Sequence, residues 1–179
     1  MKYIVLDLEA TCWRERGHKK PSEIIEIGAL AIDEQGNILD EFAHFVQPHL
    51  YPTLSPFCTE LTSITQANVD QAEKFPEVLK SFTDWIDLSQ PYLLCSWGFY
   101  DRSQFEKDCK LHQLETDWLA HHISVKHQYT ELVGAKKHMG MARALKNEGF
   151  DLVGTHHRGI DDARNIAKIF IKYQDRWQA

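Results

Sequence analysis

The 179-residue sequence lacks the features that mark several large classes of protein. No apolar stretch approaches the ~20 residues needed to cross a bilayer, so we expect no membrane segment. The first residues contain no charged and apolar run followed by a cleavage pattern, and we expect no secretory signal. Only four cysteines occur, and none forms a CxxC pair. This spacing argues against a zinc site and favours reduced thiols in a cytoplasmic protein.

Positive charge is also in deficit, because 26 acidic residues outnumber 20 lysines and arginines and give a net charge of −6. A protein that coats nucleic acid through bulk positive charge is therefore disfavoured. An enzyme that acts on nucleic acid is still compatible with this balance. If acids cluster at one site and bind divalent cations, the local sign of the charge reverses.

The order of hydrophobic patterns predicts an α/β domain with a mixed sheet. Three strand-like segments come first, and strands then alternate with helices. No repeat, low-complexity tract or long linker divides the chain, so we expect one domain over residues 1–179. We expect strands at 2–8, 22–33, 38–47, 92–97 and 119–125, helices at 76–88, 101–111, 138–148 and 160–174, and short helices capped by Ser55 and Thr65.

Two acids end the first predicted strand. Asp7 and Glu9 follow an apolar run and are separated by one residue. Residues i and i+2 of a strand face the same side, with Cα atoms roughly 6.5–7 Å apart. Two like charges held this close repel unless a cation lies between them, and carboxylate oxygens suit Mg²⁺ or Mn²⁺ better than zinc. The alternative is a pair of solvated acids at an exposed strand end, which is the commoner case for an isolated pair.

Two later segments place further acids at the ends of predicted elements. Asp101 follows the fourth predicted strand and opens a helix, and Asp161 and Asp162 open the last helix. Each of these acids could simply cap a helix or complement its dipole. His157 precedes Asp162 by five positions, but one histidine among ten is weak evidence for a site. If the fourth strand pairs with the first, Asp101 would reach the same sheet edge as the first two acids.

Taken together, the motifs DLEATC, FCTELTSITQANVD and THHRGIDDARNIAKI resemble the DEDDh 3′–5′ exonucleases. They are most similar to the Eri-type branch, which includes the histone-mRNA 3′ exonucleases and KapD-like proteins. The resemblance covers almost the whole chain and implies a single exonuclease domain with a ribonuclease H-like fold. That fold has three layers, with a mixed sheet of about five strands between helices. The positions that match the family pattern are Asp7, Glu9, Asp101, His157 and Asp162.

The resemblance also implies a two-metal reaction at the 3′ end of nucleic acid, releasing nucleoside 5′-monophosphates. Two divalent cations, Mg²⁺ or Mn²⁺, would lie about 3.5–4 Å apart, with Asp7 as the bridging ligand. The full ligand set would be Asp7, Glu9, Asp101 and Asp162. His157 would be the general base, since its ordinary pKa near ~6.5 suits neutral pH. Chemistry alone leaves Asp161 and Asp162 as alternatives, and the family spacing selects Asp162. We expect no catalytic role for His156.

The expected substrate is a single-stranded 3′ end, with RNA favoured over DNA and no obligate protein partner. In the family the segment after the first acids contacts the terminal sugar, so the backbone of Ala10 and Thr11 are candidates. Tyr100 could stack on a base, and Trp13 is a weaker candidate for contact with the 3′ nucleotide. For both aromatic residues, packing in the core is the alternative.

Two other functions are compatible with parts of the pattern. LDLEAT superficially resembles the start of a haloacid dehalogenase-type phosphatase, but the second acid is Glu, and Ala10 stands where a turn glycine is expected. A non-catalytic nucleic-acid-binding or protein-binding module on the same fold is the other alternative. Loss of a carboxylate would favour that module, whereas all five matched positions are present.

Overall fold

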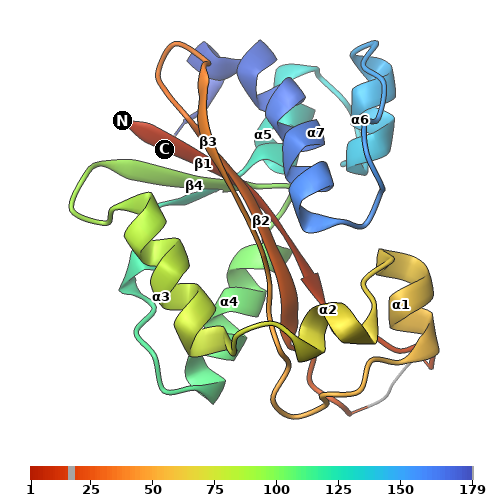
Figure 1. The fold of residues 1–179 in the computed structure, drawn as a ribbon. Coiled ribbons are helices and arrows are strands. Elements are labelled where there is room, and N and C mark those ends of the chain that lie inside the picture. The colour runs from red at the N-terminus through yellow and green to blue at the C-terminus, as the bar shows by residue number, and fades with distance from the viewer. Residues whose placement is uncertain (16–18, 179) are drawn as a thin grey trace.

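The structure is a computed structural model that describes residues 1–15 and 19–178. Within this part of the chain, a five-stranded mixed sheet has the strand order β3-β2-β1-β4-β5 (Figure 1). β2 is antiparallel to β1 and β3, whereas β4 is parallel to both β1 and β5. The strands are β1 (Lys2–Ala10), β2 (Ile24–Ile32), β3 (Ile38–Phe45), β4 (Tyr92–Ser96) and β5 (His122–Ser124).

Helices cover both faces of the sheet, as the sequence predicts (Figure 1). α3 (Phe75–Ile86) and α4 (Tyr100–Leu111) pack on one face. The other face carries α5 (Val125–Leu132), α6 (Met141–Asn147) and α7 (Gly159–Lys172). The remaining elements are α1 (Pro56–Thr62), α2 (Gln66–Asp70), and the 3₁₀ turns Asp117–Leu119 and Gln174–Arg176. In the described residues, no helix combines the length and the apolar character needed to span a bilayer.

The alternation of side chains in β1 explains where its acids point. Leu6 and Leu8 belong to the apolar cluster beneath α3 and α4, and Val5 belongs to the cluster beneath α7. Because successive side chains alternate between the two faces, Asp7 and Glu9 share the face of Val5. The first acidic pair therefore lies on the side of the sheet that α7 covers.

The predicted strand 119–125 is wrong at both ends. Its first residue closes a 3₁₀ turn, only His122–Ser124 form β5, and α5 begins at Val125 without having been predicted. Ser124 occupies the N-cap of α5, where its hydroxyl accepts a hydrogen bond from the His127 amide. This cap ends the strand although the apolar pattern alone permits it to continue. The caps predicted at Ser55 and Thr65 are confirmed.

α7 crosses the sheet at close range because two glycines face each other. A Cβ atom added to Gly28 would lie 2.1 Å from the carbonyl carbon of Gly159, and one added to Gly159 would lie 3.0 Å from the Asp7 carbonyl oxygen. Gly28 is also the register partner of Asp7 in the β1–β2 pair. The absence of both side chains therefore lets the first turn of α7 approach the backbone of the first acid.

We expect Gly28→Ala to destabilise the protein by about 1–3 kcal/mol or more, because the new methyl group would overlap the backbone of α7. Denaturant unfolding measures this loss. Ala43→Ser is the matched control, since Ala43 is the exposed register partner of Gly28 in β3, and its free energy of unfolding should change by less than about 0.5 kcal/mol. Equal stability of the two variants would contradict the packing argument.

Candidate active site

A cavity of about 570 Å³ opens beside the carboxyl ends of β1 and β4 and the first turn of α7. Its lining draws on segments that are distant in sequence: the end of β1, the start of α4, the start of α6, and the loop and first turn of α7. All five positions that the family pattern selects are on this lining, namely Asp7, Glu9, Asp101, His157 and Asp162.

The carboxylates converge at the inner end of the cavity. Asp7, Glu9 and Asp162 each offer an oxygen atom, and these atoms lie within 4.8 Å of one another. Asp101 is 4% exposed, and its Oδ1 accepts a hydrogen bond of 3.1 Å from the Leu8 amide. Because β4 pairs with β1 only as far as Leu6, this amide meets a carboxylate instead of another strand. The bond ties Asp101 to the strand that carries the first acidic pair.

Burial and mutual repulsion make these acids hard to ionise together. Burial, together with repulsion from Asp162 and Glu26, raises the pKa of Glu9 to about 8. Burial also raises the pKa of Asp7 well above its ordinary range, and Asp101, Glu9 and Asp162 add to the effect. Bound cations would relieve this repulsion, and a set of carboxylate oxygens is the donor set that Mg²⁺ and Mn²⁺ prefer. The residues present therefore fit a divalent-cation site.

Two neighbouring histidines lie beside Asp162. The His157 amide donates a hydrogen bond of 3.0 Å to Asp162 Oδ2, and Nδ1 of His156 lies 3.1 Å from Oδ1. The two imidazole rings stack with centroids 4.0 Å apart. Burial and the nearby His156 lower the pKa of His157, which favours its neutral form at pH 7. We expected no catalytic role for His156, and its side chain nevertheless contacts the Asp162 carboxylate.

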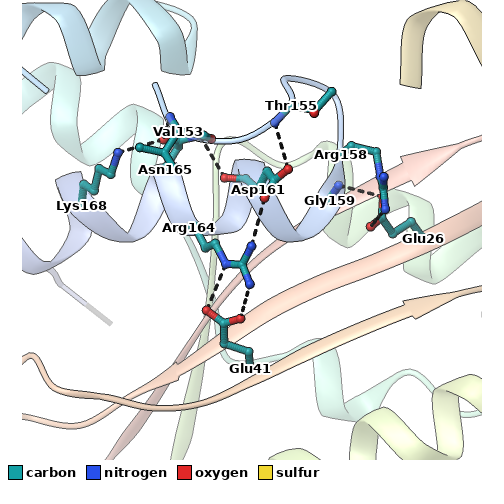
Figure 2. A network of polar contacts seen from close by, with 10 residues as sticks. All are labelled: Glu26, Glu41, Val153, Thr155, Arg158, Gly159, Asp161, Arg164, Asn165 and Lys168. Atoms are coloured by element: carbon teal, nitrogen blue, oxygen red, sulfur yellow. Dashed lines mark hydrogen bonds and ion pairs between the residues drawn. The ribbon is translucent and has the colours of Figure 1, made fainter. Parts of the chain in front are cut away.

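The loop before α7 is held by polar side chains of the helix itself (Figure 2). Asp161 Oδ2 accepts a hydrogen bond of 2.9 Å from the Thr155 amide, and Arg164 donates to Oδ1 at 3.0 Å. The fully buried Asn165 accepts from the Val153 amide and donates to its carbonyl oxygen. Asp161 therefore secures the loop that carries the histidines, while its neighbour Asp162 lines the cavity.

A buried ion pair fastens the residue after His157 to the sheet. Glu26 in β2 is 2% exposed and accepts hydrogen bonds from Arg158 Nε at 3.0 Å and from the Gly159 amide at 2.9 Å (Figure 2). The sequence did not predict this pair. An acid within the apolar strand segment IIEIGALAI was the available signal, because a buried carboxylate requires a partner. Its partner is 132 positions away, which the sequence pattern does not reveal.

Of the four residues predicted to contact the substrate, one lines the cavity and three do not. Tyr100 lines the cavity and is 53% exposed, whereas Ala10, Thr11 and Trp13 are not on the lining. The Thr11 hydroxyl accepts a hydrogen bond of 2.9 Å from the Glu23 amide, and the Trp13 ring packs against Tyr51. The lining also includes residues that were not selected from the sequence, among them Trp97, Met141 and Arg143.

Comparison with known proteins identifies the family. A family model described as Exonuclease matches residues 4–170. ERI1 exoribonuclease 2 from Homo sapiens is 35% identical over 187 residues, which cover 92% of this chain and 27% of that protein. The human 3'-5' exoribonuclease 1 is 33% identical over 177 residues, which cover 94% of this chain and 51% of that protein. The chain thus spans about a quarter and about half of the lengths of these two relatives.

Solved structures support the same assignment. The nuclease domain of 3'hExo, a DEDDh family member bound to rAMP, aligns with a TM-score of 0.90 and 31% identity over 97% of this chain and 92% of that one. A 3'-exonuclease in specific recognition of the 3' end of histone mRNA stem-loop aligns with a TM-score of 0.90 and 30% identity over 97% of this chain and 81% of that one. The predicted ribonuclease H-like fold is confirmed, and the phosphatase alternative loses its support. The chain belongs to the exonuclease family, within the Eri-type branch of its DEDDh 3′–5′ exonucleases.

Proposed function

We propose that this chain is a metal-dependent 3′–5′ exonuclease that acts on single-stranded RNA, and less readily on DNA, and releases nucleoside 5′-monophosphates. The observation that carries the proposal is the convergence of Asp7, Glu9, Asp101, Asp162 and His157 on one cavity. The relatives named above are exoribonucleases, which favours RNA as the substrate. A non-catalytic binding module would not need this costly gathering of buried acids.

Asp7, Glu9, Asp101 and Asp162 would hold two divalent cations, Mg²⁺ or Mn²⁺, with Asp7 shared between them. Cations bound there would offset the negative charge that develops on the phosphoryl oxygens. The three carboxylates with oxygen atoms within 4.8 Å support this assignment. Asp101 Oδ1 already accepts a hydrogen bond from the Leu8 amide. This is consistent with Asp101 holding its cation through a water molecule.

His157 would act as the general base. Its neutral ring takes a proton from the attacking water, the water oxygen bonds to the terminal phosphorus, and the bond to the O3′ atom of the preceding nucleotide breaks. The leaving O3′ is protonated, so the shortened chain keeps a 3′-hydroxyl group. The hydrogen bond from the His157 amide to Asp162 supports the assignment, because it holds the base beside a ligand of the site.

Tyr100 would stack on the 3′-terminal base, since it is exposed on the lining directly before Asp101. Contacts of the substrate with the Ala10 backbone, Thr11 and Trp13 stay predictions of the family resemblance. The five proposed catalytic residues come from one chain, which supports a single exonuclease domain without an obligate protein partner. The four free cysteine thiols support the cytoplasmic location.

The first test uses 5′-labelled RNA and DNA oligomers, single- and double-stranded, with Mg²⁺ or Mn²⁺. We expect successive shortening from the 3′ end of single-stranded RNA, release of 5′-monophosphates, and loss of activity with EDTA or in Asp7→Ala. Asp161→Asn and Asp162→Asn form a matched pair with the same loss of charge. Asp162→Asn should be inactive, whereas Asp161→Asn should stay within about tenfold of wild type because it only secures the loop. Binding without any cleavage would instead favour the non-catalytic module.

A second prediction concerns pH. Because the base must be neutral and burial lowers its pKa, kcat should be flat from pH 7 to 8 and should fall in acid, below the ordinary histidine pKa of ~6.5. His157→Ala should lower kcat by about 100-fold or more and remove this acid limb. Rates are measured with the metal ion saturating at each pH. As the comparison, His156→Ala should keep an acid limb but shift it to higher pH, because His156 helps to lower the pKa of His157. A profile of His157→Ala that keeps the wild-type acid limb would argue against the assignment.

A third prediction concerns the metal-free protein. Burial and repulsion raise the pKa of Glu9 from 4.5 to about 8, so its neutral form stabilises the fold at low pH and this stabilisation is lost as pH rises towards 8. Between pH 4.5 and 8, we expect the free energy of unfolding of wild type in EDTA to fall by on the order of 5 kcal/mol, since one unit of pKa difference corresponds to about 1.36 kcal/mol. Glu9→Gln should show a smaller fall and no activity. Identical pH dependence of the two proteins would contradict the repulsion argument.

A further inference from the structure

The part of the cavity lining at the start of α6 belongs to a cationic segment, although the chain as a whole has a net charge of −6. Residues 132–147, which include the part of the lining at the start of α6, carry only cations: Lys136, Lys137, Arg143 and Lys146. Residues 56–73, which form α1 and α2, carry only acids: Glu60, Asp70 and Glu73. Figure 1 shows α6 at the upper right and α1 at the lower right, so the cationic and the acidic segments lie apart from each other. A polyanion that leaves the cavity would therefore meet less repulsion along the α6 side.

A row of three rings lies on the cationic side. Phe99 is 52% exposed at the junction of β4 and α4, and its ring centroid is 4.9 Å from that of His127. The His127 ring is in turn 4.2 Å from the His138 ring. Ser124 Oγ lies 2.5 Å from His127 Nδ1, and Thr130 Oγ1 lies 3.0 Å from His138 Nδ1. These hydroxyls orient the two imidazoles, so the ring row (Phe99, His127 and His138) is a preformed surface.

Lys126 connects the ring row to the catalytic cavity. Its Nζ atom lies 3.3 Å from the position that a Cβ atom on Gly98 would occupy, next to Phe99 in the chain. Its positive charge also acts on the buried Asp101 carboxylate. Within the described residues, Lys126, Lys136 and Lys137 form no ion pair with an acidic side chain. Their ammonium groups are therefore available to a ligand.

We infer that the ring row, together with Lys126 and the cations of residues 132–147, binds the nucleotides that lie 5′ of the scissile phosphodiester. This inference rests on the proposed function. It specifies which nucleotides of the substrate would bind beside α6. Exposed ring faces stack on unpaired bases with little regard to sequence, and the ammonium groups pair with phosphates. A duplex hides the faces of its bases, so this surface selects single strands of several nucleotides over duplexes and dinucleotides.

The kinetic test compares a uridine decamer with a uridine dinucleotide. Phe99→Ala should raise KM for the decamer roughly tenfold, because loss of one aromatic–base stack is worth on this order, with kcat nearly unchanged. KM for the dinucleotide should not change, and Phe99→Trp should restore the preference for the decamer. Leu39→Ala is the matched control, since Leu39 is 56% exposed on β3 and belongs neither to the cavity lining nor to the ring row. An unchanged KM for the decamer in Phe99→Ala would overturn the inference.

A binding measurement separates this inference from the proposed function. Fluorescence anisotropy of a 5′-labelled decamer, with Mn²⁺ and in the His157→Ala background, should show roughly tenfold weaker binding for Phe99→Ala. Lys136→Gln with Lys137→Gln should reduce the salt dependence of binding, whereas Lys107→Gln with Lys110→Gln on α4 should not. If wild type cleaves nothing but these binding changes occur, the proposed function fails, and the result supports only the binding of single strands by the ring row. If wild type cleaves RNA but neither set of variants alters binding, the inference alone fails.

Discussion

Repulsion among buried carboxylates is the constraint on which the rest of this structure depends. Asp7, Glu9, Asp101 and Asp162 line one cavity, and burial raises the pKa of Asp7 and Glu9 before any neighbour acts on them. Without cations, such a cluster destabilises the fold. Binding of cations would relieve the repulsion and is therefore favoured. The apolar layers on both faces of the sheet supply the stability that holds the acids together.

Placement of α7 decides whether the cluster forms, because this helix brings the last acid to the first strand. Facing glycines at Gly28 and Gly159 permit the close crossing, and the Glu26–Arg158 pair fixes its entry point. The same helix uses Asp161 to order the loop that carries both histidines. Asp162 therefore lines the cavity, whereas the adjacent Asp161 holds the loop in place.

The uneven distribution of charge would reconcile an acidic chain with the proposed anionic substrate. Net charge describes the whole surface, whereas a bound strand experiences the side along which it lies. Here the cationic segment 132–147 adjoins the cavity beside the ring row, whereas the acidic segment 56–73 contributes no residue to the cavity lining. In the proposed binding mode, the overall balance would limit nonspecific association, while the local balance would favour a single strand along the α6 side.

By itself, the sequence determined the order of the strands and of every α-helix except α5, the caps at Ser55 and Thr65, and the five polar positions that line the cavity. Local periodicity, capping and motif spacing carry that information, since each depends on residues close together in the chain. The tertiary structure alone decided the start of α5, the contact of His156 with Asp162, the Glu26–Arg158 pair and the ring row around Phe99. Most of these features join residues that lie far apart in sequence, so only the packing of the sheet and its helices brings the partners within reach.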